Sequence, residues 1–349
     1  MGWLSEVTHP GRDNKNVIEL DLVKGVKVEG NVVNVTLAFP KRRDPLSDYI
    51  VGSTRATIIS HTSPEVDVKV KVETKEDDSQ KKKNINDLDL EELKNVKHVI
   101  GVASGKGGVG KSTVAVNLAV ALARLGFKVG LADADIYGPS VPLMTGTEEN
   151  VPMATMENDR EVILPIEKYG VKWMSIGYFA EPGQALIWRG PMACNALKQM
   201  ILQVRWGELD FLLIDMPPGT GDIHISLVND IPMEGAVIVT TPQPVALSDV
   251  EKGVNMFRNE KINRKIFGLV ENMAWFTPEE LPGNKYYIFG KNGGEEMAKK
   301  YGIELLGQIP IVQSIREGGD SGEPAALSTR PDGLAFLELA RRLAEEAEK

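Results

Sequence analysis

From about residue 97 onward, short apolar runs alternate with longer stretches in which apolar side chains recur every three or four positions. The short runs are rich in β-branched residues, as expected of strands buried on both faces of a parallel sheet, and the longer stretches are typical of helices. This alternation predicts a doubly wound α/β domain with a mostly parallel sheet. We expect strands at residues 98–104, 128–135, 211–218, 235–242, 265–273 and 305–310, and a last amphipathic helix over 332–349.

The first 75 residues follow a different pattern. Two alternating runs around Glu29-Gly30-Asn31 predict a β-hairpin, and residues 65–73 alternate as a further strand. Residues 44–60 have helical spacing, while residues 16–26 look helical at first and then turn. We therefore expect a small α+β domain over residues 1–75.

Residues 74–95 are polar and charged and have no apolar period, which is typical of a linker. The chain of 349 residues is long enough for two domains and a large core. The predicted organisation is a small α+β domain (1–75), a charged linker (76–95) and a large α/β domain (96–349).

Composition excludes several classes of protein. An apolar content of 42 % and a charged content of 26 % are ordinary for a soluble globular protein. The sequence contains no run of 18 apolar residues, so we expect no membrane span. The first residues do not resemble a secretory signal, so we expect a cytoplasmic protein. The net charge of −9 argues against binding nucleic acid by general electrostatics. The single cysteine, Cys194, excludes an internal disulfide framework.

Candidate chemistry is concentrated in SGKGGVGKST, residues 104–113. This loop matches GxxxxGK[ST] and lies between a predicted strand and a predicted helix, so its backbone N–H groups and the helix end favour phosphate. We expect Lys111 to reach the β- and γ-phosphates of ATP and the Ser112 hydroxyl to ligate Mg²⁺. The residues expected to form the cradle are Gly105, Gly107, Gly108, Val109, Gly110, Lys111, Ser112 and Thr113.

Acidic residues follow two other predicted strands. Asp215 comes after an apolar run, as expected of an aspartate that holds magnesium through water, and Gly219 is a candidate sensor of the γ-phosphate. Asp133 and Asp135 end another strand, and alternation puts them on the same side. One is a candidate for the magnesium shell and the other for orienting the attacking water. A capping role in a turn is the alternative for each.

Together these motifs resemble the deviant-Walker-A ATPases related to MinD and ParA. Further motifs narrow the resemblance to the Mrp (ApbC) family of iron–sulfur cluster carrier or scaffold ATPases, over about residues 97–345. The first 75 residues resemble the small iron–sulfur-assembly domain that often precedes such ATPases. The motifs are KGGVGKST, DADIYGPSVP, WRGPM, DMPPGTGD, TPQPVALSDVEKG, ENM and GQIPIVQSIREGGDSGEP, with IELDLVKGVKVEGNVVNVTL and VDVKVKV in the first 75 residues.

The resemblance implies a slow, Mg²⁺-dependent ATPase that works as a homodimer. It implies that Lys106 reaches across the dimer interface to the nucleotide of the other subunit, where it neutralises developing charge as an arginine finger does. Asp135 would orient the water and Asp133 would support magnesium. Asn272 would hydrogen-bond adenine, and the loop around Pro310 would wall the base.

The sequence departs from the family at its cluster ligands. Family members usually carry a CxxC after the ENM strand, and two such pairs bridge a [4Fe–4S] cluster in the dimer. Residues 271–294 contain no cysteine, and the usual Cys–Pro of the small domain is Asp44-Pro45. A dimer would bring only two Cys194 thiolates, whereas clusters usually need four. A lone cysteine is more often a small buried hydrophobe.

Three functions therefore compete. The first is an ATPase that carries clusters with ligands borrowed from client or assembly proteins. The second is an ATPase switch that has lost cluster binding and docks a partner. The third, a MinD- or ParA-like positioning ATPase, needs a membrane-targeting helix or a basic DNA-binding surface. The sequence has neither, so we expect no membrane and no nucleic-acid partner.

Overall fold

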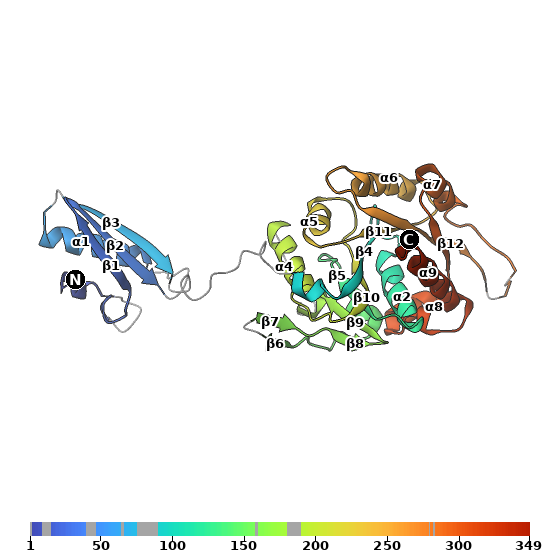
Figure 1. The fold of residues 1–349 in the computed structure, drawn as a ribbon, viewed down its shortest axis with the longest axis horizontal. Coiled ribbons are helices and arrows are strands. Elements are labelled where there is room, and N and C mark those ends of the chain that lie inside the picture. Colours follow the sequence, from blue (N-terminus) through green and yellow to red (C-terminus); the bar gives the residue numbers. More distant parts are fainter. Residues whose placement is uncertain are drawn as a thin grey trace. The chain divides into compact units, whose positions relative to one another are not determined.

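The computed structural model describes residues 2–8, 15–39, 47–63, 66–74, 90–157, 160–179, 190–278, 280–281 and 283–349. Contacts divide the chain into two compact units, residues 1–84 and 85–349 (Figure 1). The predicted domain boundaries at residues 75 and 96 stay predictions, because residues 75–89 lie outside the described part of the chain.

In its described residues, the small unit has a three-stranded sheet and the helix α1. The strand order is β1-β2-β3, where β1 and β2 form the predicted antiparallel hairpin and β3 lies parallel to β2. A parallel neighbour requires a crossover, and α1 supplies it. The predicted strands and the predicted helix are confirmed. Their bounds are β1 Val23–Glu29, β2 Val32–Phe39, α1 Ser47–His61 and β3 Asp67–Thr74.

The helical start predicted at residue 16 is a single turn instead. The Asn16 side-chain oxygen accepts the N–H groups of Ile18 and Glu19, as a cap does at the start of a helix, and the Leu20 N–H donates to the Asn16 carbonyl at 3.0 Å. Asp21 then adopts a left-handed conformation with φ of 52°, and the chain enters β1.

The large unit is built on an eight-stranded sheet with the order β13-β12-β11-β4-β10-β5-β9-β8. The strands are parallel except β8, which pairs antiparallel with β9. All six predicted strands are present, and β8 and β9 were not predicted. The bounds are β4 Val96–Ala103, β5 Val129–Asp133, β8 Ile166–Lys168, β9 Val171–Ser175, β10 Leu209–Asp215, β11 Gly235–Thr240, β12 Lys265–Phe276 and β13 Leu305–Ile311.

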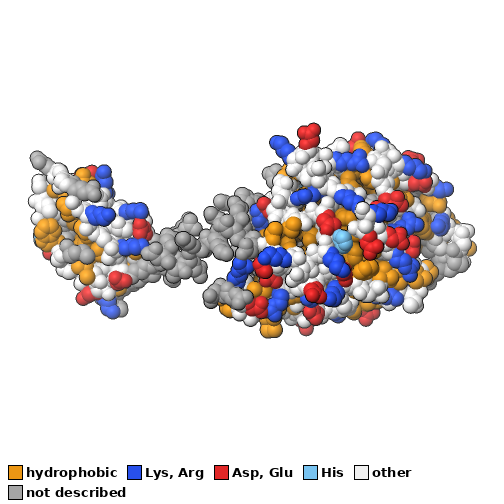
Figure 2. All heavy atoms as spheres, viewed as in Figure 1, with side chains coloured by type: hydrophobic (Ala, Val, Ile, Leu, Met, Phe, Trp, Pro, Cys, Tyr) orange, Lys and Arg blue, Asp and Glu red, His pale blue; other side chains and the backbone are white. Residues whose placement is uncertain are grey.

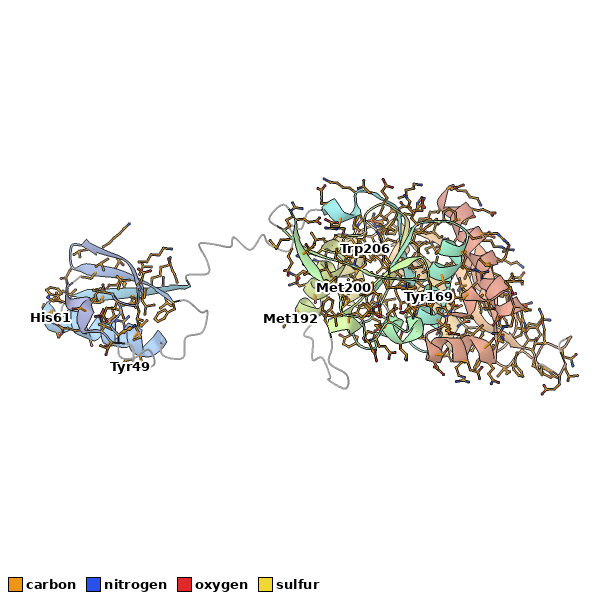
Figure 3. The ribbon with its side chains drawn as sticks, turned by 90° about the horizontal axis from the view of Figure 1, so that it is seen from below. Tyr49, His61, Tyr169, Met192, Met200 and Trp206 are labelled. Carbon is orange, nitrogen blue, oxygen red and sulfur yellow. The ribbon has the colours of Figure 1, made fainter. Side chains whose placement is uncertain are left out.

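Helices cover both faces of this sheet (Figure 1). Apolar residues of α2 and α9 form one core against it, and residues of α4, α5 and α6 form the other. Trp206 and Met200 belong to the second core (Figure 3). The predicted last helix is confirmed as α9. The bounds are α2 Lys111–Arg124, α4 Gly190–Leu202, α5 Asp222–Asp230, α6 Pro244–Arg258 and α9 Pro331–Ala347.

Shorter elements complete the large unit. They are the β6–β7 hairpin (Ala154–Glu157 and Arg160–Ile163) and the helices α3 Val141–Thr145, α7 Gly293–Tyr301 and α8 Gln313–Ser321. Among the described helices, none combines the length and apolar character that a membrane crossing requires.

The surface of the large unit mixes both signs of charge. On the face drawn in Figure 2, Lys and Arg side chains are interspersed with Asp and Glu side chains. The net charge of −9 is therefore not gathered into one region of that face.

Candidate nucleotide site

The glycine-rich loop joins β4 to α2 at the carboxyl end of the sheet, where parallel α/β proteins bind ligands. Gly108 and Gly110 have φ of 81° and 78°, which side chains rarely adopt. A Cβ atom on Gly110 would lie 2.3 Å from the Asn272 amide nitrogen, and one on Gly105 would lie 2.3 Å from the backbone of Asp249. The loop conformation therefore requires glycine at these positions.

Lys111 is the centre of the charged groups at this loop. Its ammonium nitrogen lies 2.5 Å from Asp215 Oδ1, 3.3 Å from Ser112 Oγ and 3.9 Å from Asp135 Oδ2. Lys111 is only 6 % exposed, so its charge is compensated mainly by the buried Asp215 carboxylate. The structure thus brings four of the predicted site residues together from the starts of α2 and the ends of β5 and β10.

Asp215 has an unusual environment. Its Oδ2 atom is buried and has no hydrogen-bond partner among the described residues. Burial raises the pKa of Asp215, and the neighbouring Lys111 charge opposes that rise. A spare carboxylate oxygen and the Ser112 hydroxyl are the kind of oxygen groups that suit Mg²⁺, held directly or through water.

Asp133 lies beside this group but is already engaged by protein donors. Its Oδ1 accepts the N–H of Asp135 at 3.1 Å, and its Oδ2 accepts the Val141 N–H at 3.2 Å and the Ser175 hydroxyl at 2.9 Å. Burial and the Asp215 charge raise the pKa of Asp133 to about 7. Asp133 therefore shapes the 134–140 loop that carries Asp135, and its predicted support of magnesium stays a prediction.

The two residues predicted to hold the base are close to the phosphate loop. Asn272 is nearly buried, and its amide donates to the Val109 carbonyl at 2.9 Å. Ile309 pairs with Asn272 across β12 and β13, so the half-buried Pro310 is one residue from that pairing. Asn272 therefore supports the glycine-rich loop through Val109. Its contact with adenine stays a prediction.

Lys106 stands apart from these contacts. It is half-buried in the middle of the loop, and its side chain makes no hydrogen bond or ion pair within the described ranges. Its carbonyl accepts the Ser104 hydroxyl at 2.9 Å. Gly219, with φ of 96°, donates its N–H to the Ser104 carbonyl at 3.0 Å. The glycine-rich loop and the loop that carries Gly219 are therefore joined through Ser104.

Sequence reasoning missed two residues of the site. His224 at the start of α5 is buried, and its Nε2–H donates to the Pro217 carbonyl at 2.7 Å. Ser175 holds Asp133 from the end of β9. The sequence places His224 two residues after DMPPGTGD, but nothing in the motif indicates that this histidine is buried. No local signal could have identified Ser175, because it is 42 residues from its partner along the chain.

The described residues offer no complete cluster site. Cys194 is partly exposed on α4, and no group of three or more His, Cys, Asp or Glu side chains in the described ranges is placed to hold a metal. In the region where the family carries CxxC, Phe276 and Tyr286 form an antiparallel bridge and Lys285 lies over the Trp275 ring. Asp44-Pro45 lies outside the described residues.

Solved structures share the fold of the large unit. A nucleotide-binding protein from Archaeoglobus fulgidus in complex with ADP is 37 % identical, with a TM-score of 0.61, over 72 % of this chain and 96 % of that chain. MinD from Pyrococcus horikoshii complexed with Mg-ADP is 26 % identical, with a TM-score of 0.51, over 72 % and 97 %. The predicted α/β P-loop fold is confirmed.

Relatives extend over nearly the whole chain. The iron-sulfur cluster carrier protein of Synechocystis sp. is 43 % identical over 334 residues, which is 95 % of this chain and 92 % of that protein. The protein of the same name from Aquifex aeolicus is 41 % identical over 351 residues, 96 % and 93 % of the two chains. A family model described as ParA, NUBPL iron-transfer P-loop NTPase, matches residues 95–344. The chain therefore belongs to the NUBPL iron-transfer P-loop NTPase family.

Proposed function

We propose that this chain is a slow, Mg²⁺-dependent ATPase that works as a homodimer and carries iron–sulfur clusters to client proteins. The observation that carries the proposal is the convergence of Lys111, Ser112, Asp135 and Asp215 at the end of the glycine-rich loop. The name of the relatives, iron-sulfur cluster carrier protein, supports the cargo. The cytoplasmic location rests on the sequence alone.

In this proposal each residue has a role in binding. Lys111 and the loop N–H groups hold the phosphates, and Asn272 and Pro310 hold the base. Ser112, Asp215 and Asp133 hold Mg²⁺, which when bound neutralises charge on the β- and γ-phosphates. The unpartnered Asp215 oxygen supports this assignment.

Hydrolysis breaks the bond between the γ-phosphorus and the bridging oxygen. A water attacks the γ-phosphorus, and ADP and phosphate leave. Asp135 orients that water. Lys106 acts in trans, on the nucleotide of a second copy, and neutralises the charge that develops in the transition state. The absence of any intramolecular ion pair of Lys106 in the described residues is consistent with a side chain available to a second copy.

The first test is Lys106→Ala. ATP binding should change less than about twofold, while turnover should fall by roughly 10³-fold, as for removal of an arginine finger. Lys299→Ala is the matched control, because Lys299 is exposed on α7 and pairs with Glu295 across one helical turn. Normal turnover in Lys106→Ala would sink the role in trans.

A second candidate function is an ATPase switch without a cluster. The observation that favours it is the absence of cysteine from residues 271–294, with Cys194 the single cysteine of the chain. One thiolate from each of two copies falls short of the usual four.

Iron and acid-labile sulfide per dimer, measured after anaerobic reconstitution, separate the two candidates. A stable cluster that is lost in Cys194→Ala supports the carrier with Cys194 as a ligand. A cluster that forms only when a thiol-bearing client protein is added supports a carrier with borrowed ligands. No cluster under either condition supports the switch.

A further inference from the structure

Two helices of the large unit, α3 and α8, end against each other. Helix α3 is followed by Gly146 and helix α8 by Gly322, both in the left-handed conformation, with φ of 59° and 73°. A Cβ atom on Gly322 would lie 2.5 Å from the backbone nitrogen and Cα of Gly146. The two backbones are therefore in direct contact, which only glycine permits.

The turn between β8 and β9 holds both helix ends. Lys168 donates from Nζ to the Gly146 carbonyl at 2.9 Å, and the Tyr169 hydroxyl donates to the Gly322 carbonyl at 2.8 Å. The Lys168 ammonium also lies 4.9 Å from the centre of the Tyr169 ring. Tyr169 and Gly170 both have positive φ, the conformation of a tight two-residue hairpin turn. Two neighbouring side chains on a stiff turn thus fasten two separate helices.

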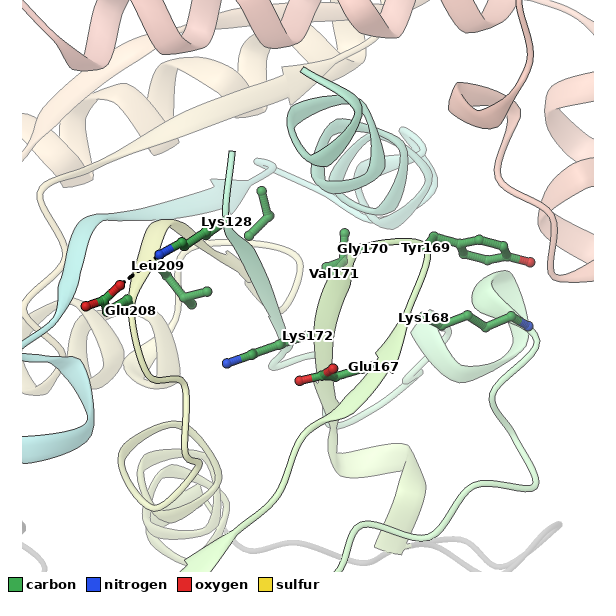
Figure 4. A pocket seen from close by; sticks show the side chains of 10 residues that line it. Lys128, Glu167, Lys168, Tyr169, Gly170, Val171, Lys172, Glu208 and Leu209 are labelled. Carbon is green, nitrogen blue, oxygen red and sulfur yellow. Dashed lines mark hydrogen bonds and ion pairs between the residues drawn. The ribbon is translucent and has the colours of Figure 1, made fainter. Parts of the chain in front are cut away.

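Figure 4 shows how these side chains are directed. The turn borders a cavity of about 590 Å³ at the amino ends of β5, β9 and β10, lined also by Lys128 and Glu208. Lys128 forms an ion pair with Glu208 at 2.7 Å. The ends of Lys168 and Tyr169 point away from this ion pair, toward the helices. The two lysines at the rim of the cavity, Lys128 and Lys168, therefore make different contacts.

The same hairpin also contacts the start of the segment that ends in α3. At the end of β9, the Ser175 hydroxyl donates to Asp133 Oδ2, and Asp133 in turn accepts the Val141 N–H at the start of α3. Residues 133–146 are thus held at one end by Ser175 and at the other by Lys168. Asp135 lies between the two attachments.

Helix α8 connects this arrangement to the other side of the site. It begins two residues after β13, the strand that carries Pro310. The contact of Gly322 with Gly146 therefore links the proposed base wall to the segment that carries Asp135.

We propose that Lys168 and Tyr169 are positioning residues of the nucleotide site: by holding α3 against α8, they fix Asp135 relative to the base wall. The inference rests on the proposed ATPase function for its effect on turnover. Its structural half, that the two side chains hold α3 and α8 together, stands without that function.

Tyr169→Phe is the first test, because it removes one hydroxyl and keeps the ring that faces Lys168. A hydrogen bond to a neutral carbonyl contributes about 1 kcal/mol, which is roughly a fivefold change in local opening. Amide hydrogen exchange over residues 141–146 and 313–322 should become about fivefold faster. Tyr49→Phe is the control, since Tyr49 is exposed in the small unit (Figure 3).

Turnover is the second readout. Tyr169→Phe should lower kcat by more than it changes the dissociation constant for ADP, which should stay within about twofold, because a positioning residue acts on the transition state. Lys168→Met should have the same pattern, and Lys128→Met, on the rim of the same cavity, should have none. Unchanged exchange in α3 and α8 in both variants would overturn the proposal. Faster exchange with unchanged kcat would also overturn it.

These outcomes separate the inference from the proposed function. If the native chain fails to hydrolyse ATP, the proposed function fails, and the exchange experiment still tests the attachment of the two helices. If the native chain hydrolyses ATP and the variants match it in kcat, only the positioning role fails.

Discussion

His224 is a buried histidine whose Nδ1 atom has no partner among the described residues, while its Nε2–H donates to the Pro217 carbonyl. Burial is the main cause that lowers the pKa of His224 below its ordinary value of 6.5. Below about pH 6.5 the unfolded chain therefore binds a proton at this position more readily than the folded chain does. The folded state is destabilised as the pH falls through that value.

His224→Gln should reduce this pH dependence. A glutamine keeps an N–H donor for the Pro217 carbonyl but does not titrate, so the free energy of unfolding should fall less between about pH 7.5 and 5.5 than in the native chain. Urea unfolding followed by tryptophan fluorescence at the two pH values measures the difference. Parallel losses in the native chain and His224→Gln would contradict the role of His224.

Local motifs made the centre of the site predictable. The spacing of Lys111 and Ser112 in the loop and the position of Asp215 after an apolar run predicted the groups that the structure brings together. The contacts of Asp133 were not predictable, because Ser175 reaches it only through the pairing of β5 with β9. Contacts made across a sheet leave no trace in nearby sequence.

Helices α7 and α8 of the large unit both end in left-handed glycines, and the surroundings of the two glycines differ. Gly302 follows α7 with φ of 58°, and a Cβ atom there would meet nothing within 4 Å. Gly322 follows α8 with φ of 73°, and its Cβ atom would collide with the backbone at Gly146. A comparison of the two glycines therefore separates two contributions to the free energy of unfolding: the strain of a left-handed backbone and the steric clash of an added Cβ atom.

Gly302→Ala should cost about 1 kcal/mol of unfolding free energy, the penalty for a side chain in the left-handed region. Gly322→Ala should cost roughly 1 to 3 kcal/mol more, because two packed backbones must separate. Urea unfolding of both variants and of the native chain measures the difference. Equal losses would mean that α3 and α8 part without cost.

Among the secondary-structure elements, the longer strands were predicted from their buried apolar runs. The order of the strands in the sheet could not be predicted from these runs. β8 has three residues and β9 five, and β9 includes polar Lys172 and Ser175, so neither forms a continuous apolar run. The helical start at Asn16 was predicted, and it ends after one turn, where Asp21 adopts a left-handed conformation with φ of 52°. Short elements depend on single residues more than on periodicity.

For the whole molecule, the central prediction is that one active site is completed by a second copy. Lys106→Ala and Lys111→Ala chains should each be inactive alone. In a mixed dimer, the Lys106→Ala copy still binds nucleotide and the other copy still supplies Lys106. An equal mixture allowed to exchange subunits should therefore recover about a quarter of the native ATPase rate, since half of the dimers have one competent site.

The measurement is ATP turnover before and after mixing, at constant total protein. A lysine that acted within its own chain would leave both sites of the mixed dimer incomplete, and the mixture would stay inactive. The fold class and the family were predictable from the motifs of the large unit. The cargo was not, because the family's usual thiols are missing and nothing in residues 271–294 replaces them.

The contact between Lys111 and Asp215 has a consequence for the form in which nucleotide enters the site. The Lys111 and Asp215 charges neutralise each other in a buried place. A nucleotide that draws Lys111 to its phosphates leaves the Asp215 carboxylate without a counter-charge, which is costly in the interior. A divalent cation arriving on the same phosphates restores that balance. If the proposed function holds, the loop should therefore discriminate against metal-free nucleotide, and ATP should bind at least about tenfold more weakly in EDTA than in magnesium. The buried pairing of Lys111 with Asp215 would in this way couple the binding of a nucleotide to the binding of its metal.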